Sequence, residues 1–293
     1  MAHLTILWQQ FPILFLILSS VLALVIGSFL NVVIYRLPLM LKRQWRADCQ
    51  QFLGELEDEP ALPEGIFNLS LPRSSCPHCQ HKIAFWQNVP LISWLLLRGH
   101  CHYCKHPISW RYPLVELLSL LLVMLAFLQF SLTGKWLFAC LFSLTLLTLA
   151  VIDLRTMLLP DQLTLPLLWI GLLVNSHHLF VSLHQAIWGA ALGYLCLWSL
   201  YWGFKLLTGK EGMGYGDFKL LAAIGAWLGW ASLPMVLLLS SASGALFGIW
   251  LLILRRSKRQ TPLPFGPFLT LGALCYLLYG PTLSYSYGLL IGG

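Results

Sequence analysis

Two aspartates of this chain stand where apolar segments end or begin, and together they could carry acid–base chemistry. Asp153 follows the apolar run Leu149–Ile152, and Asp217 follows the glycine-rich stretch Gly212–Gly216 just before another apolar run. Two carboxyl groups brought together cannot easily both ionise, so one keeps its proton while the other stays charged. The charged group can take a proton from an attacking water, and the neutral one can donate to a carbonyl oxygen. The pair therefore indicates hydrolysis of a peptide bond.

Each aspartate also has a structural interpretation. Asp is a favoured N-cap residue, because its carboxylate accepts free N–H groups of a first helical turn. Both Asp161 and Asp217 begin apolar runs. We favour the cap for Asp161, whereas for Asp217 the cap and the chemistry have equal weight. Asp153 ends a predicted helix, where a negative charge opposes the helix dipole, so capping explains it poorly.

Four cysteines form a second chemical motif. Cys76-Pro-His-Cys79 and Cys101-His-Tyr-Cys104 are two CxxC pairs joined by a returning loop. Four thiolates can bind Zn²⁺ with tetrahedral geometry and leave no open position, so the predicted zinc is structural. The alternative is a pair of disulfides, which a reducing cytoplasm disfavours. Five histidines nearby could replace a thiolate, although surface positions are favoured for them: His78, His81, His100, His102 and His106.

Apolar helices must position these residues. The chain has 293 residues, of which 58% are hydrophobic and 10% charged, whereas soluble domains carry about 25% charged residues. The net charge of +7 does not indicate nucleic acid, because basic residues punctuate apolar runs and form no patch. We predict an all-α polytopic membrane protein with about eight transmembrane helices and a small cytoplasmic zinc-binding insert. The predicted spans are roughly Phe11–Tyr35, Pro113–Leu132, Trp136–Ile152, Leu163–Asn175, Ala186–Phe204, Leu220–Trp230, Leu233–Leu254 and Phe265–Tyr279.

The basic residues predict the orientation in the membrane. Apart from Lys135, every Lys and Arg lies in one of four alternate connections, namely 36–112, 153–162, 205–219 and 255–264. The positive-inside rule places these connections in the cytoplasm and both termini in the periplasm. Asp153 and Asp217 then share the cytoplasmic face.

This pattern divides the chain into three parts. Residues 1–35 form a first transmembrane helix, 36–112 form the insert with the CxxC pairs, and 113–293 form a transmembrane aspartyl peptidase bundle. Within the insert, Val89–Leu97 is apolar but too short to span, so it either docks on the bundle or lies at the membrane interface.

The motifs taken in order resemble those of type IV prepilin peptidases, the bifunctional leader peptidases and N-methyltransferases of bacterial pilus and type II secretion systems. The resemblance runs almost from end to end. It rests on Gly27–Pro38, Arg73–Cys79, Asn88–Pro90, Ser93–Trp94, Arg111–Glu116, Ile152–Asp153, Leu159–Asp161, Gly212–Leu220 and Phe265–Phe268.

The resemblance implies an inner-membrane enzyme that cleaves prepilins or pseudopilins after a glycine at the cytoplasmic face. It also implies methylation of the new N-terminal residue, usually Phe, with S-adenosylmethionine as the methyl donor. The family's catalytic aspartates map onto Asp153 and Asp217. The methyl-donor site is unknown, with Arg73 and Glu116 as candidates; Glu116 either pairs with a cation such as Arg111 or helps an active site.

Two other classes of function compete with this interpretation. An ion-coupled transporter would use buried aspartates to bind a cation, but such sites tend to lie near the bilayer midplane, not at its rim. A zinc-dependent membrane scaffold would explain the cysteines but would give no function to Asp153 and Asp217.

Overall fold

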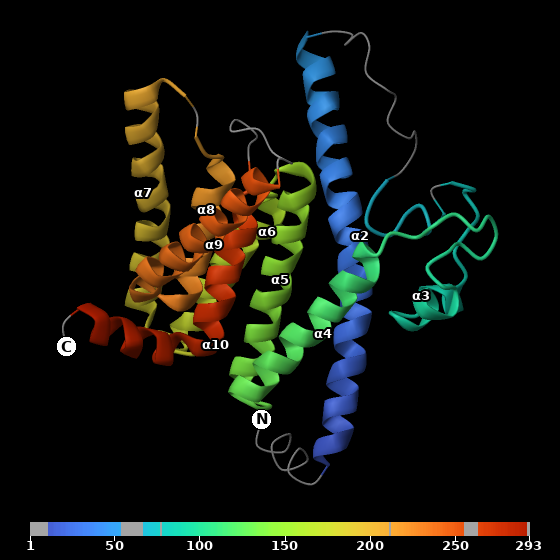
Figure 1. The fold of residues 1–293 in the computed structure, drawn as a ribbon, viewed down its shortest axis with the longest axis horizontal. Coiled ribbons are helices and arrows are strands. Elements are labelled where there is room, and N and C mark those ends of the chain that lie inside the picture. Colours follow the sequence, from blue (N-terminus) through green and yellow to red (C-terminus); the bar gives the residue numbers. More distant parts are fainter. Residues whose placement is uncertain (1–10, 54–66, 77, 211, 255–262, 292–293) are drawn as a thin grey trace. The chain divides into compact units, whose positions relative to one another are not determined.

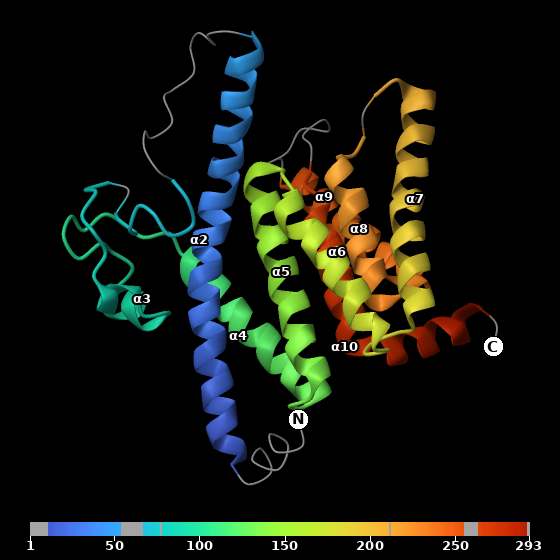
Figure 2. The ribbon, with the colours of Figure 1, turned by 180° about the vertical axis from the view of Figure 1, so that it is seen from behind.

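The computed structural model describes residues 11–53, 67–76, 78–210, 212–254 and 263–291 (Figures 1 and 2). The described residues form helices and contain no strand, apart from two isolated β-bridges in the insert. This confirms the predicted all-α fold class. The chain divides into two compact units, the first ending at Met124 and the second beginning at Leu125. The basic residues at 255–259 lie outside the described residues.

The first unit holds one long helix and the cysteine-rich insert. Its elements are α2 (Pro12–Leu53), the 3-10 helix η1 (Phe85–Asn88), α3 (Ile92–Leu96) and most of α4 (Arg111–Phe130). The second unit is a bundle. Its elements are α5 (Gly134–Thr156), α6 (Asp161–Ser176), α7 (Leu183–Thr208), α8 (Tyr215–Leu228), η2 (Trp230–Ser232), α9 (Leu233–Ile253) and α10 (Gly266–Ile291).

Each of the eight predicted spans falls on one helix. Within the described ranges, five helical segments are long and apolar enough to cross a membrane, namely Ile13–Phe52, Arg111–Phe130, Gly134–Thr156, Leu183–Thr208 and Trp230–Ile253. The part of α10 from Gly266 to Gly280 is also apolar but shorter than these five segments. The number of helices that cross the membrane therefore stays a prediction.

Helix α8 forms the centre of the bundle. Every residue from Leu220 to Gly229 is buried, which explains why this stretch is apolar on all sides yet too short for a span. The helix ends at Gly229, whose φ of +78° lies in the left-handed region that favours glycine. Helices α6 and α7 pack against it.

Glycines allow α7 to approach α8 closely. A Cβ added at Gly189 would collide with the carbonyl group of Gly225, and one added at Gly193 would lie 2.7 Å from the carbonyl oxygen of Leu221. Two glycines four residues apart share one face of a helix, and in lipid such a face gains van der Waals contact from close backbone approach. The Gly189–Gly193 pair thus fixes the α7–α8 crossing.

Two side chains join α6 to α8 through backbone groups. The fully buried Asn175 donates to the carbonyl oxygens of Ala226 and Trp227 (2.9 and 3.0 Å), and its own carbonyl oxygen accepts from the N–H groups of Phe180 and Val181 (both 3.1 Å). Trp227 Nε1 in turn donates to the carbonyl oxygen of α6 Leu167 (2.7 Å). These bonds satisfy the free carbonyl groups at the end of α8.

We expect Asn175→Ala to lower the free energy of unfolding by about 2–4 kcal/mol, because two buried carbonyl groups and two part-buried N–H groups lose their partner. Thermal or denaturant unfolding in detergent, followed by circular dichroism, measures this. Ser176→Ala is the matched control, because the neighbouring Ser176 is exposed and bonds only the carbonyl oxygen of Leu173. Equal stability of the two variants would contradict the assigned role of Asn175.

Candidate active site and metal centre

Asp153 lies in the last turn of α5 and is only 5% exposed. Its Oδ2 accepts a hydrogen bond from the backbone N–H of Gly266 at the first residue of α10 (3.0 Å). A Cβ at position 266 would lie 2.7 Å from the same oxygen, so only glycine fits there without a shift. The start of α10 therefore offsets the unfavourable position of an anion at the end of α5.

Asp217 lies in the first turn of α8 and is 7% exposed. The N-cap of α8 is Gly214, and the Asp217 N–H donates to its carbonyl oxygen (3.2 Å). Asp217 is the third residue of the helix, and its carboxyl group accepts a hydrogen bond from the backbone N–H of the N-cap Gly214, which is a capping contact. Capping therefore accounts for part of the placement of Asp217, and its catalytic role stays a prediction.

The fold brings the surroundings of the two aspartates together. Leu159, in the connection between α5 and α6, lies 2.8 Å from the Cβ position of Gly216 and 3.3 Å from that of Gly266. The first turns of α8 and α10 therefore meet over one side chain beside the end of α5. The two carboxyl groups are also close enough for the charge of Asp153 to act on Asp217. In the part of the chain that the structure describes, neither carboxyl forms an ion pair.

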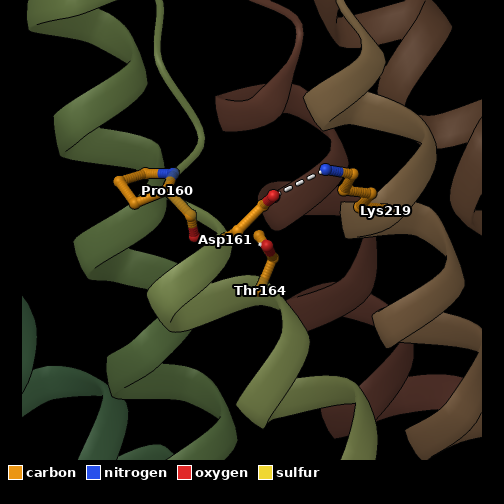
Figure 3. Close-up of polar contacts among 4 residues, drawn as sticks. All are labelled: Pro160, Asp161, Thr164 and Lys219. Carbon is orange, nitrogen blue, oxygen red and sulfur yellow. Dashed lines mark hydrogen bonds and ion pairs between the residues drawn. The ribbon is translucent and has the colours of Figure 1, made fainter. Parts of the chain in front are cut away.

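Asp161 has a different environment (Figure 3). It is the first residue of α6, whose N-cap is Pro160 and not Asp161. Instead, Lys219 Nζ of α8 donates to both carboxylate oxygens (2.8 and 2.7 Å). The predicted N-cap role of Asp161 was therefore wrong. Pro160 occupies the N-cap position, and the Asp161 carboxylate pairs with Lys219 instead. The pair is partly exposed, so it is worth at most about 1 kcal/mol.

The four CxxC cysteines gather in the insert. Their sulfur atoms all lie within 4.8 Å of one another, and Cys76 Sγ is 3.8 Å from Cys104 Sγ. Tetrahedral Zn–S bonds of about 2.3 Å give sulfur–sulfur distances near 3.8 Å, whereas a disulfide needs about 2.05 Å. All four cysteines are free. The cluster therefore could bind Zn²⁺.

The two CxxC pairs have the same backbone geometry. In the first, Cys76 N–H donates to the carbonyl oxygen of His81 (3.0 Å); in the second, Cys101 N–H donates to that of His106 (2.8 Å). Gln80 and Lys105 take the same left-handed conformation (φ 56°) to close each turn. Hydrogen bonding from the Cys79 backbone lowers the pKa of the Cys76 thiol to about 7, which favours the thiolate that metals bind.

Glu116 is buried where α4 crosses α2. Its Oε2 accepts from the backbone N–H of Leu91 (2.8 Å), and its carboxyl also bonds the Ser28 hydroxyl. Gly27 permits the crossing, because a Cβ there would lie 2.9 Å from the Cα of Glu116. Among the described residues Glu116 forms no ion pair with Arg111, so the cation partner considered from the sequence is wrong.

Arg73, the other candidate for methyl-donor binding, is exposed. No hydrogen bond or ion pair joins it to Glu116 in the described ranges. A role of either residue toward a methyl donor therefore stays a prediction.

Sequence reasoning missed the roles of Gly266 and Lys219. Both belong to segments that carry the family resemblance, Phe265–Phe268 and Gly212–Leu220, but neither segment reveals its partner. Gly266 supplies an N–H to Asp153, and Lys219 pairs with Asp161. For the contact between Gly266 and Asp153, the one local signal in the sequence is a glycine that follows the aromatic Phe265 at the start of an apolar run.

Comparisons with known proteins cover nearly the whole chain. Residues 21–130 match the bacterial peptidase A24 N-terminal domain, and residues 140–249 match the type IV leader peptidase family. A prepilin leader peptidase/N-methyltransferase from Aeromonas hydrophila is 54% identical over 96% of this chain and 94% of its own. Proteins of the same name from Stutzerimonas stutzeri and Pseudomonas aeruginosa are 52% and 49% identical, each over 94% of both chains. Among solved structures, none matches.

Identity near one half over almost the full length of both partners reflects common ancestry and not a shared motif. Both family models match in the expected order along the chain. The chain therefore belongs to the type IV leader peptidase family, the type IV prepilin peptidases that the order of its motifs resembles.

Proposed function

We propose that this protein is a membrane aspartyl endopeptidase that removes the leader from type IV prepilins or type II secretion pseudopilins. It cleaves after a glycine at the cytoplasmic membrane face and then methylates the new N-terminal residue, usually Phe, with S-adenosylmethionine. The observation that carries the peptidase assignment is the convergence of two buried carboxyl groups, Asp153 and Asp217, without an ion-paired cation in the described residues. The names of the relatives support both activities.

The two carboxyl groups divide the acid–base work. The ionised one takes a proton from water, whose oxygen attacks the carbonyl carbon of the scissile bond, while the protonated one donates to the carbonyl oxygen. When the tetrahedral intermediate collapses, the C–N bond breaks and the leaving nitrogen receives a proton. The products are a leader with a free carboxylate and a chain with a free amine. The Gly266 N–H fixes one oxygen of Asp153, so the other is directed to water or substrate.

Two glycines before Asp217 do different things. Gly214 is exposed, and the nearest atom to a Cβ there would be the Asp217 Oδ2 at 3.9 Å, so a substrate backbone can approach this side of the carboxyl. Gly216 packs against Leu159 and is needed for the fold instead. The glycine-rich stretch thus supports both access and packing.

The insert supplies the remaining chemistry. Cys76, Cys79, Cys101 and Cys104 would hold a structural Zn²⁺, which would cross-link the two CxxC turns. S-adenosylmethionine supplies a methyl group to the new amine, which must be neutral to react. We keep Arg73 and Glu116 as candidates for its site, since both belong to the first unit, which contains the cysteines. The basic connections face the cytoplasm, with both termini in the periplasm.

The proposed function predicts two separable products. Purified protein in detergent, incubated with a prepilin and isotopically labelled S-adenosylmethionine, should yield a shortened pilin carrying the labelled methyl group. Mass spectrometry reports leader loss and methylation independently. Leader loss without the label would refute the methyltransferase half, and an intact prepilin would refute the peptidase half.

Asp153→Asn and Asp217→Asn should each lower the cleavage rate by about 10²–10⁴-fold, because the site loses an acid or a base. Asp161→Asn is the matched control, since Asp161 also begins a helix at the same end of the bundle but is ion-paired with Lys219. We expect it to retain most of the activity. Single-turnover cleavage of a prepilin measures all three variants. Retained cleavage in Asp153→Asn or Asp217→Asn would remove that residue from the mechanism.

Cys76→Ser should reduce the zinc content from about one ion per chain, because a neutral hydroxyl replaces one of four thiolates. The metal is quantified by inductively coupled plasma mass spectrometry, and limited proteolysis reports the stability of the insert. Cys49→Ser serves as control, because Cys49 is an exposed free cysteine on α2 outside the cluster. Unchanged zinc content in Cys76→Ser would argue against the four-thiolate site.

A further inference from the structure

An exposed apolar edge runs along α3. It consists of Ile92, Leu95 and Leu96, whose exposed fractions are 56%, 66% and 75%. Single exposed apolar residues are common on soluble proteins. Here three occur within one five-residue helix, and Trp86 (51% exposed) precedes them on η1. This α3 edge is therefore a surface that needs an apolar partner.

A hydrogen bond fixes the position of α3 along α4. Leu91, the N-cap of α3, donates its N–H to Glu116 (2.8 Å), which lies five residues after Arg111 at the start of α4. At 1.5 Å per residue, this contact lies about 7–8 Å from the beginning of α4. Figures 1 and 2 accordingly show α3 beside the middle of α2 and not past its end. The short helix therefore begins alongside a membrane-crossing helix.

The outer surface of α4 is the nearest established apolar surface. This helix is long and apolar enough to cross a membrane. Its residues Leu114 (37%), Leu117 (52%) and Leu121 (49%) are exposed and apolar. Interfacial helices bury their apolar side about 5–10 Å into the boundary between headgroups and acyl chains. The α3 edge begins next to Leu91, which contacts α4 about this distance from the start of the helix.

The residues around the α3 edge have the composition of a membrane interface. Trp110 (63% exposed) and Tyr112 (41%) stand at the start of α4, where aromatic belts of membrane proteins lie. The exposed Arg98 follows α3, and the exposed Arg111 begins α4. Anionic lipid headgroups attract such cations by about 1 kcal/mol each near the surface.

The α3 edge is rigidly connected to the cysteine cluster. Ser93 donates to the carbonyl oxygen of Trp86 (2.6 Å), and Trp94 Nε1 lies 3.4 Å from the carbonyl oxygen of Ile108. Gly99, with φ +69°, packs directly under the Trp94 ring. The next residue, His100, forms the β-bridge with Pro107 that closes the second CxxC turn. The α3 edge and the four cysteine sulfur atoms therefore belong to one connected part of the insert.

We propose that the α3 edge inserts into the headgroup–acyl boundary of the membrane that α4 crosses and thereby holds the cysteine cluster at the membrane surface. This interaction does not depend on the proposed enzymatic function. Other occupants of the α3 edge would be the helices of the second unit or a second copy of the chain.

A photo-crosslinker distinguishes these occupants. p-Benzoylphenylalanine replaces Leu96 in the full chain, reconstituted into vesicles of phosphatidylethanolamine and phosphatidylglycerol without substrate. The matched control carries the same residue at Lys82, an exposed position on the first CxxC turn that lies outside the α3 edge. Bound zinc confirms that both variants keep the insert folded. After illumination, mass spectrometry identifies what has been captured.

We expect phospholipid adducts at position 96, several-fold more abundant than at position 82. Adducts of position 96 with residues 125–293 or with a second copy would overturn the proposal, as would lipid capture no greater than at position 82. In a second measurement, the double variant Leu95→Glu and Leu96→Glu should increase hydrogen exchange of the α3 amides in vesicles but not in lipid-free detergent. Equal exchange of the variant and the unmodified chain in vesicles would also contradict lipid insertion.

Discussion

The burial of two carboxyl groups at the ends of apolar helices is the constraint on which the rest of this structure depends. Removing a carboxylate from water is costly unless other groups offset it, and no ion pair to Asp153 or Asp217 occurs among the described residues. Helix starts provide the offset: Asp153 accepts the Gly266 N–H at the start of α10, and Asp217 lies in the first turn of α8. The beginnings of α8 and α10 must therefore converge on the end of α5.

That convergence requires small residues wherever two backbones meet. Gly266 leaves room for the Asp153 carboxylate, and Gly216 leaves room for Leu159. Along the same α8, Gly225 faces Gly189 of α7. Because each Cβ would displace a helix that carries or supports a carboxyl group, the glycines constrain the site as strongly as the aspartates do.

The features that could be predicted from the sequence are those with a local signal. Apolar runs predicted the helices, and the CxxC spacing predicted the gathering of four sulfurs. Asp161 was misassigned because its partner, Lys219, lies on another helix and no local pattern links them. For Glu116 the sequence left a cation partner such as Arg111 and an active-site role open, and it gave no sign of the backbone N–H of Leu91 that the carboxyl accepts from. Contacts between distant segments depend on packing, which local periodicity does not encode.

A site at helix ends also meets a requirement that a mid-span site would not. Hydrolysis of a peptide bond needs water and an extended substrate backbone, and both are excluded from the hydrocarbon region of a bundle. The Asp161–Lys219 pair, with side chains 49% and 33% exposed, lies two residues beyond Asp217 and marks where solvent reaches the first turn of α8. Asp217 itself, two residues earlier in the same turn, is buried. In the proposed mechanism a peptide would therefore meet the carboxyl groups at helix ends, whereas a transported cation would need a path through the bundle.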